Sequence, residues 1–102
     1  MAYKPRDLGE FANYVAKTVE HYKGRIKYWE ILNEPLYTTY AVPERFGHTP
    51  NDYVELLKVA FRAIRSKDPE AKVIGGIGGL GSAHFSEAII ELGALDYLDY
   101  LN

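Results

Sequence analysis

Apolar residues recur along the chain at two spacings, which predict an alternation of helices and short strands. The helical spacing of i, i+3 and i+4 appears within residues 7–24, 49–69 and 85–93. Asp7 and Thr49 are typical residues for a helix start, and Gly24 and Gly93 are typical of a helix end. The pattern therefore predicts three helices.

Three shorter runs predict strands. Residues 26–32 and 72–77 are compact and rich in β-branched or aromatic residues, and residues 94–101 could form a third strand. The order helix, strand, helix, strand, helix, strand is typical of a parallel sheet with right-handed crossovers. We therefore expect an α/β fold in which three helices alternate with two or three parallel strands.

The first predicted strand runs directly into a polar turn, YWEILNEP at residues 28–35. Ligands of open α/β sheets bind at the carboxyl ends of the strands, so Asn33 and Glu34 arrive at that rim. Pro35 disfavours a helical conformation at Glu34, and we expect an extended backbone there. A carboxyl group near Trp29 and tyrosines would suit a general acid, because an apolar surround raises its pKa. The alternative is an ordinary polar turn with Glu34 solvated.

Composition excludes several classes of function. The 102 residues contain no cysteine, which rules out a disulfide scaffold or a thiolate zinc site. A net charge of −2 argues against a general nucleic-acid binder, and no apolar run approaches the roughly 20 residues of a membrane span. The three histidines fall on different elements, so we expect no metal and no cofactor. The N-terminus has no apolar segment typical of a signal peptide, which leaves the localisation open.

Residues 28–35 resemble the fourth-strand motif of the clan A retaining glycoside hydrolases, which are (β/α)8 barrels. Residues 21–25 are similar to the end of the preceding helix, residues 68–76 to the approach to strand five, and residues 85–102 to helix five and the start of strand six. Within the clan, the likeness is greatest to the xylosidase- and arabinofuranosidase-like families. The resemblance implies that residues 1–102 form a single piece of a TIM barrel, from about helix three to strand six.

The resemblance also assigns roles. Glu34 would be the acid/base residue, and Asn33 would hydrogen-bond the sugar beside the scissile bond. A retaining enzyme needs a second carboxyl group roughly 5–5.5 Å from the first. In this clan that nucleophile ends strand seven, which lies beyond these residues. The resemblance therefore implies a carbohydrate substrate for the whole enzyme and an isolated chain without normal activity.

Aromatic residues gather around this motif. Trp29, Tyr37 and His48 join Asn33 as candidate substrate contacts, and Tyr40 and Phe46 lie in the same long loop, residues 36–48. In a barrel this loop overhangs the active face, where aromatic rings could stack on sugars. The alternative is a local hydrophobic cluster that packs the loop down.

Two other functions stay open. A piece with only two or three parallel strands has exposed edges, so the chain could be a self-associating structural unit that forms homo-oligomers. Residues 76–81 also match G-x-G-x-x-G between a predicted strand and helix, with Asp99 placed as a ribose-binding acid near the end of the next strand. That pattern is typical of a dinucleotide-binding unit.

Overall fold

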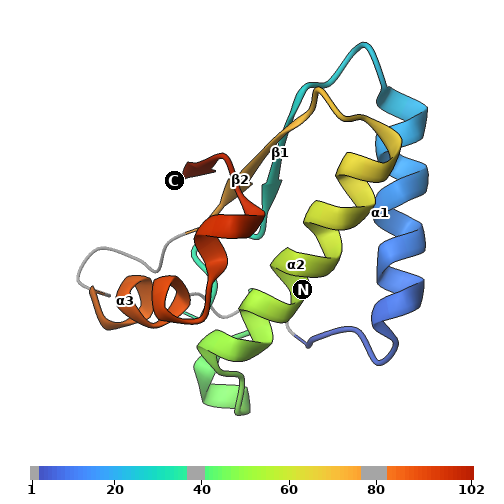
Figure 1. Cartoon of the computed structure of the whole chain (residues 1–102). Coiled ribbons are helices and arrows are strands. Elements are labelled where there is room, and N and C mark those ends of the chain that lie inside the picture. The colour runs from blue at the N-terminus through green and yellow to red at the C-terminus, as the bar shows by residue number, and fades with distance from the viewer. Residues whose placement is uncertain (1–2, 37–40, 77–82) are drawn as a thin grey trace.

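A computed structural model describes residues 3–36, 41–76 and 83–102 of the chain (Figure 1). Within these ranges, helices and strands alternate. The helices are α1 (Leu8–Tyr22), α2 (Pro50–Lys67) and α3 (Ala83–Glu91), and the strands are β1 (Tyr28–Ile31), β2 (Lys72–Gly75) and β3 (Tyr100–Leu101). Two short 3₁₀ helices, η1 (Glu44–Phe46) and η2 (Ala94–Tyr97), precede α2 and β3.

The strands form one parallel sheet in the order β1-β2-β3. Tyr28 pairs with Lys72 and Ile31 with Gly75, so β1 and β2 end together. Ile74 pairs with Tyr100, which places the start of β3 beside the second half of β2. The predicted α/β fold, a partial (β/α)8 barrel with parallel strands, is confirmed.

The third predicted strand is wrong in its first half. Gly93 adopts a left-handed φ of 86°, and the chain then turns through η2 instead of extending. Burial explains this path, because Ala94 is fully enclosed and the Tyr97 ring packs edge-on against Phe61 at a centroid distance of 5.8 Å. Only Tyr100 and Leu101 are left to pair as a strand.

Both long helices begin where their capping residues predict. The Asp7 side chain accepts hydrogen bonds from the backbone N–H groups of Gly9 and Glu10 at the start of α1. Thr49 and Asp52 form a reciprocal capping box at the start of α2, with Pro50 in the first turn. These caps satisfy N–H groups that have no partner within the helix.

The core lies between the helices and one face of the sheet. In Figure 1, α1 and α2 lie side by side along that face, and α3 and η2 contact α2. Fully buried side chains of this core include those of Val19, Tyr53, Leu57, Ile64, Val73 and Ile89. The other face of the sheet is open, since Tyr28 is 57% exposed and Tyr100 51% exposed.

Across the described ranges, no helix combines the length and apolar character needed to cross a membrane. Those same ranges contain no group of three or more His, Cys, Asp or Glu side chains suited to a metal ion.

Candidate active site at the carboxyl end of the first strand

The polar turn after β1 lies at the carboxyl end of the sheet, as the sequence predicts. β1 ends at Ile31, and Leu32 leads into the exposed Asn33 and the half-buried Glu34. Pro35 follows with its ring fully buried. The structure therefore brings Asn33 and Glu34 together at the rim. The buried Pro35 anchors their turn in the protein interior.

The backbone of this turn is not extended. Leu32, Glu34 and Leu36 have φ values of 60°, 44° and 66°, all in the left-handed region that non-glycine residues rarely adopt. The prediction of an extended backbone at Glu34 is therefore wrong. The proline does disfavour a right-handed helical conformation, but the packing of the turn selects the left-handed region over the extended one. Such conformations cost about 1–3 kcal/mol each and persist only where their surroundings enforce them.

Gly76, the residue after β2, packs directly against this turn. A Cβ atom at Gly76 would lie 2.6 Å from the carbonyl oxygen of Leu32 and 2.9 Å from Cδ of Pro35. Both atoms belong to groups that cannot rotate away. Glycine is therefore required at this position for the two chain segments to come so close.

The Tyr53 hydroxyl joins the ends of β1 and β2 beneath the turn. The backbone N–H of Gly76 donates to Oη of Tyr53 at 2.8 Å, and this hydroxyl donates to the carbonyl oxygen of Ile31 at 2.9 Å. The side chain comes from the first turns of α2 and is completely buried. Burial raises the pKa of Tyr53 well above its ordinary value, so the hydroxyl keeps the proton that it donates.

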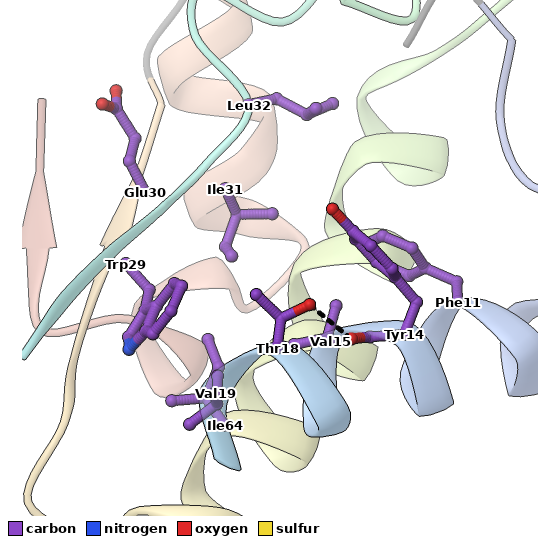
Figure 2. Close-up of a pocket in the computed structure, with 10 residues that line it drawn as sticks. All are labelled: Phe11, Tyr14, Val15, Thr18, Val19, Trp29, Glu30, Ile31, Leu32 and Ile64. Carbon is purple, nitrogen blue, oxygen red and sulfur yellow. Dashed lines mark hydrogen bonds between the residues drawn. The ribbon is translucent and has the colours of Figure 1, made fainter. Parts of the chain in front are cut away.

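The Trp29 side chain lies on the face of β1 that the helices cover and not at the rim. Figure 2 shows that Trp29 and Ile31 point toward the helices, whereas Glu30 points away from them. The indole ring lies 6.4 Å from the Tyr22 ring, and its buried Nε1 has no hydrogen-bond partner among the described residues. The structure thus places the Trp29 side chain on the helix side of β1, a position that does not favour contact with a sugar at the rim.

A cleft of about 310 Å³ opens on this helix side of β1 (Figure 2). The residues that line it are mostly apolar: Phe11, Tyr14, Val15, Thr18, Val19, Trp29, Glu30, Ile31, Leu32 and Ile64. Neither Asn33 nor Glu34 lines the cleft, which meets the turn at Leu32.

The loop after the turn is packed down at its two ends but not in its middle, where residues 44–47 are exposed and Phe46 is 43% exposed. Ala41, Val42 and Pro43 are buried, and the N–H of Leu36 donates to the carbonyl of Ala41 at 2.9 Å. His48 is only 9% exposed. The buried residues favour the local hydrophobic cluster, whereas the ring of Phe46 stays exposed. Tyr37 and Tyr40, two of the predicted loop aromatics, lie outside the described residues.

The position of Asp99 argues against the dinucleotide-binding hypothesis. Asp99 comes just before β3, at the amino end of that strand and not near its end as predicted. Its carboxylate accepts hydrogen bonds from the N–H of Val73 and from the guanidinium of Arg65. Asp99 therefore links α2 and β2 to the start of β3, at the amino end of that strand. A nucleotide would bind at the carboxyl ends of the strands. Most of the glycine motif lies outside the described residues.

Sequence reasoning did not identify Tyr53 and Gly76 as part of this site. Tyr53 fits the apolar stripe of α2, and Gly76 begins a run of glycines. The spacing gives no sign that the two meet under residues 32–36. The only available signal was the tyrosine itself, because a buried hydroxyl requires a polar partner.

The fold is that of a partial (β/α)8 barrel, and the family comparison places the chain in the class of clan A glycoside hydrolases. More particularly, residues 4–75 match the family model described as glycosyl hydrolase family 10. The match spans well over half of the chain and includes α1 through β2. The chain therefore belongs to glycosyl hydrolase family 10. No solved structure gives a significant match to it.

Proposed function

We propose that Glu34 is the acid/base residue of glycoside hydrolysis and that Asn33 hydrogen-bonds the sugar next to the scissile bond. The position of Glu34 directly after β1, on the carboxyl rim of the sheet, is the observation that carries this proposal. Its partial burial supports it, because a general acid works best where water does not fully solvate it. Membership of the family supports a carbohydrate substrate.

The second carboxyl group of the reaction comes from outside the described residues. β2 runs into Gly76, so this strand brings no carboxylate to the rim. Retaining hydrolysis needs a nucleophile about 5–5.5 Å from the acid. We therefore propose that the 102 residues alone do not turn over glycosides.

An aryl glycoside assay on the isolated chain tests this second point. We expect release of the aryl alcohol from aryl β-xylosides and aryl α-arabinofuranosides to stay at the background rate. Turnover that disappears in Glu34→Gln would contradict the proposal, because it would require a nucleophile within these residues.

A chimeric barrel tests the role of Glu34 itself. Residues 4–75 would replace the matched segment of an active family 10 enzyme, which supplies the other carboxylate. Glu34→Gln should then lower kcat by about 10²–10⁴-fold for glycosides with poor leaving groups and much less for activated ones, because only poor leaving groups need a proton. Glu70→Gln is the matched control, since this exposed residue lies at the amino end of β2. A folded chimera that keeps its activity in Glu34→Gln would overturn the assignment.

A further inference from the structure

We propose that Tyr53 is a positioning residue, whose hydroxyl holds the turn that carries Asn33 and Glu34 in its left-handed conformation. The catalytic meaning of this inference rests on the proposed role of Glu34, but the structural claim does not. It extends the site to an α2 side chain that lies beneath the rim and touches no substrate.

The Tyr53 hydroxyl makes one hydrogen bond on each side of the turn contact. Oη donates to the carbonyl of Ile31, which immediately precedes Leu32, the first residue of the turn with a positive φ. The same oxygen accepts from the N–H of Gly76. One buried atom therefore fixes the backbone at the entry to the turn and the backbone that packs against it.

Gly76 packs tightly against the turn. Its Cα leaves no room for a side chain beside the carbonyl of Leu32 and the ring of Pro35. A small shift of Gly76 would therefore open or close this contact. By fixing the Gly76 N–H, the Tyr53 hydroxyl sets the surface against which Leu32 and Pro35 rest.

The Tyr53 side chain has support from α2 and from α3. Thr49 and Asp52 cap the helix directly before Tyr53, and the Tyr53 ring packs against Phe85 at a centroid distance of 5.7 Å. Neither of these supports involves the turn, so the ring can serve as a fixed point for it. Removing the hydroxyl should release the turn and leave the ring in place.

NMR spectroscopy on the full chain tests the proposal with Tyr53→Phe. In the wild-type chain, we expect strong intraresidue HN–Hα NOEs at Leu32 and Glu34, which are typical of positive φ, and a slowly exchanging Tyr53 hydroxyl proton. In the variant, these NOEs should weaken and the Gly76 amide should exchange about tenfold faster or more, because its buried acceptor is gone. Tyr97→Phe is the matched control, since its half-buried hydroxyl makes no hydrogen bond among the described residues.

The outcomes separate a positioning role from a merely structural one. If Tyr53→Phe lowers the melting temperature but leaves the NOEs of Leu32 and Glu34 unchanged, the proposal is overturned. If the variant does not fold, the wild-type measurement decides, because a rapidly exchanging Tyr53 hydroxyl proton would also overturn it. None of these readouts depends on catalysis. A released turn in Tyr53→Phe combined with full activity of the Glu34→Gln chimera would therefore contradict only the proposed function.

Discussion

At the scale of single residues, two neighbouring glycines at the end of β2 meet very different surroundings. A Cβ atom at Gly75 would lie 2.6 Å from a terminal methyl of Leu98, which is the flexible end of a side chain. A Cβ atom at Gly76 would meet the Leu32 carbonyl and the Pro35 ring. Backbone and a buried ring cannot move aside as a leucine methyl can, so the two positions should tolerate a methyl group unequally.

We expect Gly76→Ala to destabilise the protein by about 1–3 kcal/mol or more, which is the usual cost of forcing extra atoms into a packed site. Gly75→Ala is the matched control and should cost clearly less, because Leu98 can change rotamer. Urea denaturation of both variants measures the difference. Equal free energies of unfolding would show that the turn yields as easily as the leucine does.

The residue scale also shows where the sequence stops being informative. The position of Asn33 and Glu34 at the strand end could be predicted, because a buried strand leading into a polar turn is a local pattern. The left-handed backbone at Glu34 could not, since it depends on Gly76 packing from another strand. The hydroxyl contact of Tyr53 could not be read either, because helical spacing reports which side of a helix is buried and not what its polar atoms meet.

At the scale of elements, the start of α2 combines a cap with an ion pair. One carboxylate oxygen of Asp52 accepts from the Thr49 N–H at 2.9 Å, and the other lies 2.6 Å from Nζ of Lys4. The hydrogen bond from Lys4 lowers the pKa of Asp52 below its ordinary value of 3.8, and the Thr49 N–H lowers it further against the opposing effect of burial. This acid therefore links the chain before α1 to the first turn of α2.

The direction of that pKa shift predicts how stability depends on pH. The folded protein binds the Asp52 proton more weakly than the unfolded chain does, so the stabilisation is present above about pH 4 and is lost as the pH falls through the lower folded-state pKa. Asp52→Asn keeps a capping oxygen but lacks the charge. We expect the difference in melting temperature between wild type and Asp52→Asn to shrink as the pH is lowered from about 6 to about 2.

Lys4→Met provides the control for the charge. Lys4→Met should remove much of the same pH-dependent part of the melting temperature. The double variant, Lys4→Met with Asp52→Asn, should melt at nearly the same temperature as either single variant. A difference between wild type and Asp52→Asn that stays constant down to acid pH would mean that the carboxylate acts only as a cap.

The elements themselves were the most predictable part of the fold. α1 and α2 begin at caps that depend on a few adjacent residues, and those caps are visible in the sequence. The third strand was overestimated, because Ala94 and Tyr97 have an apolar pattern that suits a buried 3₁₀ turn as well as a strand. Only contact with α2 distinguishes the two.

At the scale of the whole molecule, helices cover one face of the sheet and leave the other open. Tyr28 and Tyr100 lie on the open face with their rings 6.4 Å apart, and both are more than half exposed. Asn102 donates to the Glu30 carboxylate at 2.7 Å beside them. β1 and β3 are the two edges of the sheet, and each has backbone groups with no neighbouring strand among the described residues.

We therefore expect the chain to self-associate through these edges and this face, since both present groups that favour pairing. Sedimentation velocity should show an average mass that rises with concentration. Replacing Tyr28 and Tyr100 by lysine should shift the equilibrium toward the monomer. A compact monomer at every concentration, with cooperative unfolding, would contradict the expectation.

α2 is attached to the sheet at two points, and the distance between these points fixes the length of helix between them. Near the start of α2, Tyr53 hydrogen-bonds the carboxyl end of β1. Near the end of α2, Arg65 hydrogen-bonds Asp99, which lies just before β3. Inserting one residue between the two points would rotate one attachment by about 100° relative to the other and lengthen the gap by about 1.5 Å. Only one of the two could then form, so the number of residues from 53 to 65 is fixed by the sheet that the helix spans.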